Sequence, residues 1–260
     1  MADILFARVG AVATLTLNRP EKLNSFTRAM HAELREALSL VETDGSIRAL
    51  VVNGSGRSFC AGQDLADLSF TPGAATDLGE LIEQNFNPLI KRIQALPIPV
   101  IASVQGTAAG AGANLALACD IVLAARSASF LQAFSKIGLL PDSGGTWFLP
   151  QRVGMARAMG LALLAEKLPA EKAEQWGLIW KCVDDDALAA ETEQLAHHLA
   201  AQPTKALGMI KSALRVGVGN ALDAQLDIEA RAQRELGQSA DYAEGVNAFL
   251  EKRAPQFIGR

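Results

Sequence analysis

The sequence predicts an α/β protein in which a mainly parallel sheet is followed by a helical C-terminal region. Up to about residue 145, short apolar runs rich in β-branched residues alternate with longer amphipathic segments. This alternation is typical of parallel strands, because each parallel connection needs a crossover, usually a helix. Beyond residue 145 the chain is rich in alanine and its pattern is helical. With 260 residues, the chain can bury a sizeable core in one or two domains.

The first 45 residues predict a hairpin followed by a helix. The β-rich runs 4–9 and 11–17 are separated by Gly10, which is typical of a hairpin. From about Thr27 to Val41, apolar residues recur every three or four positions, so we expect an amphipathic helix with Thr27 as its N-cap.

Three wholly apolar runs predict strands that are covered on both faces. They are residues 49–52, 100–104 and 121–124. A long helix is expected from about 77 to 96, because Pro97 ends its pattern. After about Gly145 we expect helices alone, with Pro169 and Pro203 at helix starts.

Charge and cysteine content exclude several classes of protein. The chain has 24 basic and 28 acidic residues and a net charge of −4, so no net positive field attracts nucleic acid or an anionic membrane. Cys60, Cys119 and Cys182 lie far apart and form no C-x-x-C pair, which excludes a disulfide framework or a zinc site. No apolar run approaches the roughly 20 residues that span a bilayer, and Asp3 stands where a signal peptide is positive. We therefore expect a cytoplasmic protein.

Two glycine-containing segments are candidates for ligand binding through backbone N–H groups. Residues 58–65 form a loop after a predicted strand, where glycine lets amides point at a ligand. Residues 105–114 follow another strand and open a helix, so unpaired N–H groups and the positive end of the helix dipole meet there. This second segment matches neither a dinucleotide fingerprint nor a Walker A motif. An ordinary turn and close helix–sheet packing are the respective alternatives.

The third candidate is Asp142, which stands between Pro141 and a Ser-Gly-Gly turn. An acid at this position is either a helix cap or a functional carboxylate, and spacing does not decide between the two. The histidines offer no catalytic pattern, and no G-x-S-x-G sequence accompanies Ser143. Neither a hydrolytic triad nor a metal site is expected.

Five motifs in order resemble the enoyl-CoA hydratase/isomerase (crotonase) superfamily over nearly the whole chain. They are 17–20 with 24–26, 59–65, 109–112, 118–121 and 144–146. The resemblance implies a spiral of ββα turns, an acyl-CoA substrate, no permanently bound cofactor and no metal. It also implies a core over residues 1–200 and a helical region over 201–260 that forms a homotrimer or a dimer of trimers and covers the active site.

The resemblance gives the two glycine-containing segments one shared role. Aligned motif by motif, the backbone N–H groups of Gln63 and Ala111 would form an oxyanion hole for the thioester carbonyl. Removing a proton next to a thioester places negative charge on the carbonyl oxygen. Two fixed donors in a dry pocket stabilise that charge by about 3–4 kcal/mol per donor in comparable sites.

The same resemblance argues against hydration. Family hydratases activate water with two glutamates, and this sequence has Asn114 and Phe134 at those positions. An amide does not take a proton at pH 7, and phenylalanine forms no hydrogen bond. Asp142 instead stands where the isomerase and dehalogenase branches place an acid. We expect it to move a proton between two carbons, with its pKa raised by an apolar pocket.

Two long runs, 134–147 and 239–250, resemble a branch of isomerases that convert the ring epoxide of phenylacetyl-CoA to a seven-membered oxepin thioester. A shift of Δ3 to Δ2 enoyl-CoA is expected as a related activity. Two alternatives remain: a hydratase with a displaced base, and a non-catalytic acyl-CoA-binding protein.

The expected substrate-binding residues surround the two loops. They are Lys22, Asn24, Ala61, Gly62, Asp64, Leu65, Gly110, Asn114 and Phe134. The neighbourhoods of residues 22–24 and 61–65 would contact the adenine and pantetheine of CoA. Lys252 or Arg253 would form ion pairs with the CoA phosphates. Phe134 would line the acyl pocket. The segment from about 68 to 86, in which Thr71-Pro72-Gly73 and an acidic stretch suggest a mobile loop, would shape this pocket.

Overall fold

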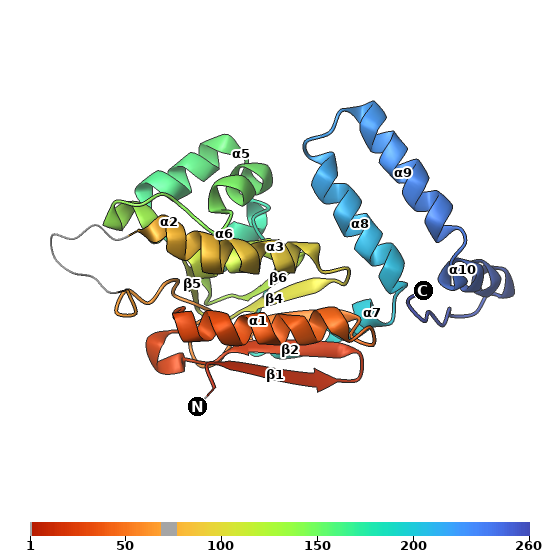
Figure 1. Cartoon of the computed structure of the whole chain (residues 1–260), viewed down its shortest axis with the longest axis horizontal. Helices are drawn as coiled ribbons and strands as arrows, with labels where there is room; N and C mark the ends of the chain where they lie inside the picture. The colour runs from red at the N-terminus through yellow and green to blue at the C-terminus, as the bar shows by residue number, and fades with distance from the viewer. Residues whose placement is uncertain (1, 69–76) are drawn as a thin grey trace.

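The largest element of the fold is a six-stranded sheet in the order β1-β2-β3-β4-β6-β9 (Figure 1). The computed structural model describes residues 2–68 and 77–260. The strands of this sheet are β1 (Ile4–Val9), β2 (Val12–Leu17), β3 (Ala49–Gly54), β4 (Val100–Val104), β6 (Ile121–Ala125) and β9 (Lys181–Val183). β1 and β2 form the predicted antiparallel hairpin, and all later pairs in this sheet are parallel.

A second, three-stranded sheet contains β5 (Thr107–Ala109), β7 (Ser129–Leu131) and β8 (Leu168–Pro169). The expectation that only helices follow Gly145 is therefore wrong, because β8 and β9 lie beyond it. β9 pairs with β6 through Leu123 and Lys181. Strands of two or three residues are too short to show a period of two, so neither could be recognised from its own pattern.

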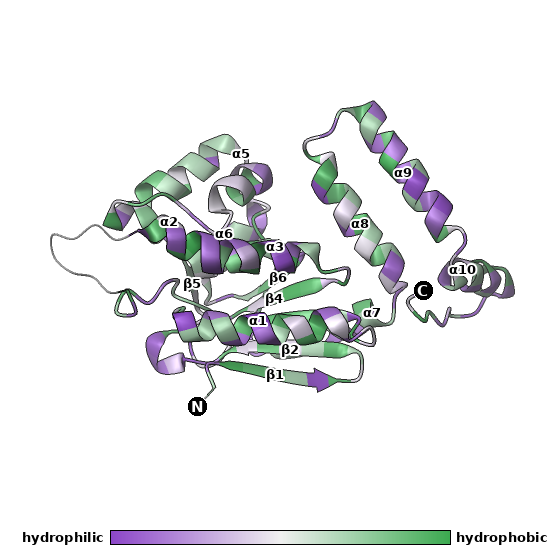
Figure 2. Cartoon of the chain, viewed as in Figure 1, coloured by the Kyte–Doolittle hydropathy of each residue, from purple (hydrophilic) through white to green (hydrophobic). Residues whose placement is uncertain are grey.

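Helices cover both faces of the main sheet. α1 (Arg28–Thr43) begins at the predicted N-cap, where the Thr27 hydroxyl accepts a hydrogen bond from Met30 N at 3.1 Å. It lies in front of β1 and β2 in Figure 1, whereas α7 (Leu188–Ala200) packs against β2, β3, β4 and β6. The strands of the sheet are mostly hydrophobic (Figure 2) and belong to one contiguous core.

The helix expected from 77 to 96 is divided in three. α2 (Leu78–Leu81) is followed by a π-helical turn, η2 (Ile82–Phe86), and then by α3 (Asn87–Ala95). Pro88 explains the division, because proline has no N–H for the carbonyl four residues earlier and its ring crowds that turn. The segment Thr71–Gly73 lies outside the described residues.

Three shorter helical elements complete the site region. They are the 3-10 turns η1 (Pro20–Lys22) and η3 (Ala133–Ile137), and α4 (Ala111–Ala118). α5 (Gly145–Leu164) and α6 (Ala170–Gln175) follow, and Pro169 directly precedes α6 as predicted. α4 opens at the Gly-rich segment 105–114, so the expected strand-to-helix turn is present, with β5 inserted before it.

The last three helices follow one another at one end of the molecule (Figure 1), and the first of them contacts the main sheet. They are α8 (Thr204–Gly217), α9 (Leu222–Leu236) and α10 (Ala240–Glu251), and α8 begins directly after Pro203 as predicted. Neither α8 nor α9 has a buried residue. Asp120 anchors α8 to the sheet through Lys211 at 2.6 Å and Arg215 at 2.5 Å. No helix in the described part of the chain is both long and apolar enough to cross a membrane.

Candidate active site

The second glycine-containing segment forms the start of α4, and the first turn of this helix carries Ala111. Gly110 precedes this turn with φ 54° and ψ −128°, a backbone conformation that is accessible almost only to glycine. It lets the chain pass directly from β5 into α4. Ala111 N–H is the first amide of the helix and has no acceptor within residues 2–68 and 77–260. A helix leaves its first amides unpaired in this way, so Ala111 offers a donor to a ligand.

The loop that contains Gln63 lies directly against this turn. Cys60 accepts a hydrogen bond from Ala109 N at 2.8 Å. A Cβ placed on Gly62 would lie 3.0 Å from the Ala109 carbonyl oxygen and 3.5 Å from Ala111 N, so only glycine permits this approach without displacement. Gln63 N–H also lacks an acceptor among the residues that the structure describes. Two unpaired amides, one from each predicted segment, therefore lie on adjoining stretches of backbone.

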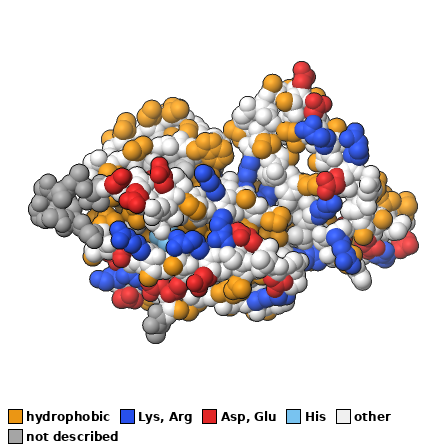
Figure 3. Space-filling model, in the orientation of Figure 1, with side chains coloured by type: hydrophobic (Ala, Val, Ile, Leu, Met, Phe, Trp, Pro, Cys, Tyr) orange, Lys and Arg blue, Asp and Glu red, His pale blue; other side chains and the backbone are white. Residues whose placement is uncertain are grey.

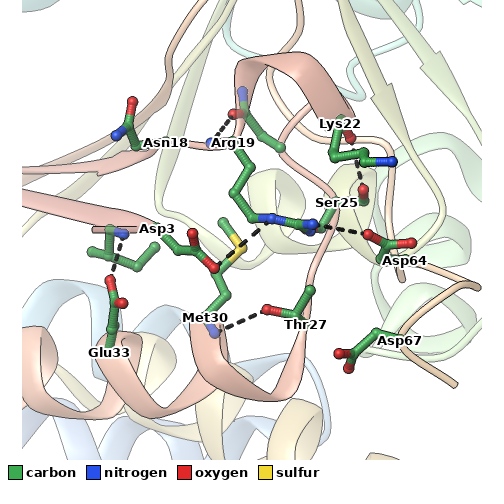
Figure 4. A network of polar contacts seen from close by, with 12 residues as sticks. Asp3, Asn18, Arg19, Lys22, Ser25, Thr27, Met30, Glu33, Asp64 and Asp67 are labelled. Carbon is green, nitrogen blue, oxygen red and sulfur yellow. Dashed lines mark hydrogen bonds and ion pairs between the residues drawn. The ribbon is translucent and has the colours of Figure 1, made fainter. Parts of the chain in front are cut away.

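Polar side chains hold the Gln63 loop in place, and Figure 4 shows one of these contacts, between Arg19 and Asp64. Arg19 donates to the Asp64 carboxylate at 3.0 Å and to the Ser25 carbonyl at 2.5 Å. Asn24 is fully buried, and its amide donates to three backbone carbonyls, those of Ser55, Ser58 and Phe59. Asn24 and Asp64 were expected to contact substrate. In this structure their side chains bind the protein, and their contact with substrate stays a prediction.

Asp142 lies on the turn between η3 and α5, where it is partly buried. Burial raises the pKa of the Asp142 carboxyl above its usual value, and a hydrogen bond from the Ser143 hydroxyl to Oδ1, at 2.9 Å, lowers it in part. The predicted direction of this pKa shift is confirmed. The Asp142 carbonyl accepts a hydrogen bond of 2.8 Å from the Asn114 side chain. Because Asn114 lies three residues after Ala111, Asp142 is tied to the turn that carries the candidate oxyanion donor.

Both polar side-chain atoms of Asn114 have partners within the protein. Asn114 is fully buried, its Nδ2 donates to Asp142 and its Oδ1 accepts from Gln132 Nε2 at 2.9 Å. These bonds give Asn114 a supporting role in the fold, and its expected contact with substrate stays a prediction. Gln132 and Ser143 were not among the predicted site residues. Ser143 could have been suspected as the neighbour of Asp142, whereas nothing local marks Gln132.

Phe134 forms an apolar wall beside the first turn of α4. It is buried in η3, and a Cβ placed on Gly110 would lie 3.7 Å from its ring. Three further predicted substrate-binding residues lie as follows. The side chains of Leu65 and of Lys22, at the end of η1, are exposed. Ala61 N donates a hydrogen bond of 2.9 Å to the Leu23 carbonyl.

The two C-terminal cations differ in their surroundings. Arg253 forms ion pairs of 2.6 Å with both Glu244 and Glu251, so its charge is already compensated within this chain. Lys252 ends α10 in a left-handed conformation and is exposed.

The remaining titratable side chains form no second reactive centre in the described ranges, 2–68 and 77–260. These ranges contain no cluster of three His, Cys, Asp or Glu side chains able to hold an ion. His31 is buried between the rings of Phe26 and Phe86, and burial lowers its pKa to about 4. It is therefore a neutral core residue at pH 7.

Comparison with known proteins agrees with this geometry. A family model described as enoyl-CoA hydratase/isomerase matches residues 8–260. The chain belongs to this family. The predicted family and the crotonase-type α/β fold are thereby confirmed.

Two relatives and one solved structure illustrate the similarity. The 1,2-epoxyphenylacetyl-CoA isomerase of Escherichia coli (strain K12) is 60% identical over 250 residues, which cover 96% of this chain and 95% of that protein. A Rhodobacter capsulatus protein named "Probable enoyl-CoA hydratase" is 53% identical, with the same coverage. The crystal structure of an enoyl-CoA hydratase from Bacillus anthracis matches with a TM-score of 0.93 at 30% identity, covering 99% of this chain and 100% of that one.

Proposed function

We propose that this chain is an acyl-CoA isomerase that converts ring-1,2-epoxyphenylacetyl-CoA to oxepin-CoA and shifts Δ3 enoyl-CoA double bonds to Δ2. One observation carries the proposal: the carboxylate residue Asp142 is tied through Asn114 to the helix turn that presents the candidate oxyanion amide of Ala111, and the loop that carries the Gln63 amide lies against this turn. The 60% identity to the Escherichia coli isomerase supports the substrate class.

In the simplest reaction, the thioester carbonyl binds between the N–H groups of Gln63 and Ala111. Ionised Asp142 removes a proton from the carbon next to the thioester, and the negative charge moves to the carbonyl oxygen. Neutral Asp142 then returns the proton two carbons further along, as the double bond moves from Δ3 to Δ2. Atoms and charge balance, and the coenzyme A portion leaves unchanged as part of the product.

The ring epoxide uses the same first step. The methylene between the ring and the thioester loses a proton to Asp142, the bond between the two epoxide carbons opens to give the seven-membered ring, and a ring carbon takes the proton. A carboxyl whose pKa is raised by burial suits both roles, because its ionised form is a stronger base than an ordinary carboxylate and its neutral form gives up a proton more readily than water does.

The hydratase alternative, which the Rhodobacter capsulatus relative suggests, lacks a group to activate water. Asn114 is a buried amide that takes no proton at pH 7 and bonds to Asp142 and Gln132, and Phe134 is apolar. The discriminating assay is hydration of crotonyl-CoA. A hydration rate typical of efficient enzymes would favour the hydratase. A protein that binds CoA thioesters but shows no activity in any assay would favour the binding protein.

For the assembly, we propose a homotrimer or a dimer of trimers in which residues 1–200 form the acyl-CoA-binding core and 201–260 associate and cover the site. Apolar side chains are exposed over α5 and the C-terminal helices (Figure 3), including Leu214 at 70% and Phe249 at 82%. Patches of this kind are typical of subunit interfaces. Sedimentation of the wild type and of Leu214→Glu tests it, and a monomeric wild type would contradict it.

The decisive experiment replaces Asp142 by Asn and measures both Δ3-to-Δ2 conversion and CoA-thioester binding. We expect turnover to fall by about 10²- to 10⁴-fold, with binding retained, because the amide keeps the shape but takes no proton. Glu166→Gln, which neutralises an exposed carboxylate, is the matched control and should be fully active. Normal turnover in the Asp142 variant would remove this residue from the mechanism.

A further inference from the structure

The residue after Asp142 has an unusual backbone and a specific contact. Ser143 adopts φ 51°, in the left-handed region that side chains other than those of Gly, Asn and Asp rarely occupy. It is only 2% exposed, and its hydroxyl donates to Asp142 Oδ1 at 2.9 Å. A glycine would adopt this backbone conformation at lower cost, so the serine side chain itself needs an explanation.

The main chain of Asp142 is already held without Ser143. Its carbonyl accepts hydrogen bonds of 2.8 Å from the Asn114 side chain and from Gly145 N. These bonds set where the residue lies but not how its carboxylate is turned. The Ser143 hydroxyl is the group in the described structure that contacts a carboxylate oxygen, and it contacts Oδ1 alone.

This contact makes the two carboxylate oxygens unequal. Burial and the Ser143 hydroxyl are the influences on the Asp142 pKa within the described residues, and no charged side chain adds to them. An oxygen that already accepts a hydrogen bond is a weaker base than one that does not. The proton taken from a substrate carbon is therefore better received by Oδ2.

We infer that Ser143 is a positioning residue that holds Oδ1 of Asp142 and leaves Oδ2 to take and return the proton. This inference rests on the proposed isomerase function. In the first half of the reaction, the substrate C–H bond breaks and an Oδ2–H bond forms, while the serine stays on Oδ1. In the second half, the Oδ2–H bond breaks and a new C–H bond forms, so the serine gains and loses nothing.

The test compares Ser143→Ala and Ser143→Gly with the wild type. Both variants lose the hydroxyl, but glycine fits φ 51° without strain, so the pair separates loss of the hydrogen bond from an altered backbone. We measure kcat and KM for Δ3-to-Δ2 conversion over a pH series, and deuterium uptake from D₂O at the carbon next to the thioester.

For both variants we expect kcat to fall by about 3- to 10-fold at neutral pH, as for a lost hydrogen bond to a charged group. KM should stay within about twofold, because the hydroxyl acts on Asp142 and not on substrate binding. The acidic limb of kcat/KM should move to higher pH, because the bond that favours the ionised carboxylate is gone. Deuterium uptake should slow in parallel with kcat.

The possible failures are distinguishable. If the wild type is active and Asp142→Asn is inactive, but Ser143→Gly keeps the wild-type kcat and pH profile, the role of Ser143 is overturned and the isomerase function stands. The role of Ser143 is likewise overturned if only Ser143→Ala is impaired, because strain would then be the cause. An inactive wild type, or an active Asp142→Asn, overturns the proposed function itself. Thermal melting of each variant verifies folding.

Discussion

Asn114 donates a side-chain hydrogen bond of 2.8 Å to the backbone carbonyl of Asp142, and this bond joins α4 to the turn before α5. The first turn of α4 also carries Ala111, the candidate oxyanion donor. The acid and the donor are thereby held in one rigid arrangement. Asn114, which stands at a position where the family resemblance implies a hydratase glutamate, thus supports the backbone of the residue that carries the candidate catalytic carboxylate.

Replacing Asn114 by Leu should impair turnover, because its side chain supports the turn that carries Asp142. Leucine is of similar size but removes both hydrogen bonds and leaves Gln132 Nε2 without its partner, a loss of about 1–3 kcal/mol in the free energy of unfolding. Turnover should fall about 10²-fold, since small displacements of a catalytic group are costly. Urea unfolding and isomerase assays measure the two effects. Asn220→Leu, in an exposed turn, is the control, and equal activity of the two variants would contradict the supporting role.

Gly62→Ala should disturb the oxyanion site directly. The new methyl group would lie 3.0 Å from the Ala109 carbonyl oxygen, and the alanine would have to adopt φ 91°. The two loops must then separate, and we expect kcat to fall about 10²- to 10³-fold, as when a donor of this kind is lost. Gly45→Ala adds a methyl group where nothing lies within 4 Å and should keep full activity. An active Gly62→Ala enzyme would show that the approach of the loops is not required.

The pH profile of the wild type should reveal the burial of Asp142. The base must be ionised, so kcat/KM falls as pH falls through its pKa. Burial raises this pKa, so the acidic limb should lie above the usual aspartate value of about 3.9. A limb at or below that value, in an enzyme that stays folded over the range, would contradict the buried environment of the carboxylate.

His31 should make the fold sensitive to mild acid. Its pKa is about 4 in the folded chain, against an ordinary value of 6.5, because burial disfavours the charged ring. Below pH 6.5 the unfolded chain binds a proton that the folded chain does not, so stability falls as pH drops toward 4, by about 3 kcal/mol in total. Urea unfolding of His31→Phe, whose ring can keep the contacts with Phe26 and Phe86, should show a weaker dependence between pH 4 and 6.5. An unchanged dependence would assign the effect to other groups.

Asp120→Ala should release α8 from the sheet. Asp120 bridges Lys211 and Arg215, and all three side chains are at most 21% exposed, so the two cations would be left without their partner. Removing one member of a buried ion pair costs about 3–5 kcal/mol. Limited proteolysis near Pro203 should be faster in the variant, and urea unfolding should show the lower free energy of unfolding. Glu251→Ala, which removes an exposed partner of Arg253, should have an effect below about 1 kcal/mol, and equal effects of the two variants would contradict the anchoring role.

The regular elements of the core could be predicted because each has its own period. The run 100–104 is β4, and the pattern from Thr27 to Val41 lies within α1 and its cap. The elements that the sequence did not predict correctly include two kinds. β5, β8 and β9 are too short to carry a period, and Pro88 divides a helix whose apolar pattern continues across the break.

The sequence alone identified the family and the lack of both hydratase glutamates. It also singled out the two glycine-containing segments and Asp142. Each of these depends only on which residue type stands at a given position along the chain. Only the tertiary structure showed that the buried side chains of Asn24 and Asn114 hydrogen-bond to distant parts of the protein, and that the Ser143 hydroxyl donates to one carboxylate oxygen of Asp142. The physical reason is that a buried amide or hydroxyl must find a partner. Asn114 finds its partner 28 residues away, through the packing of α4 against the turn before α5, which no local pattern encodes.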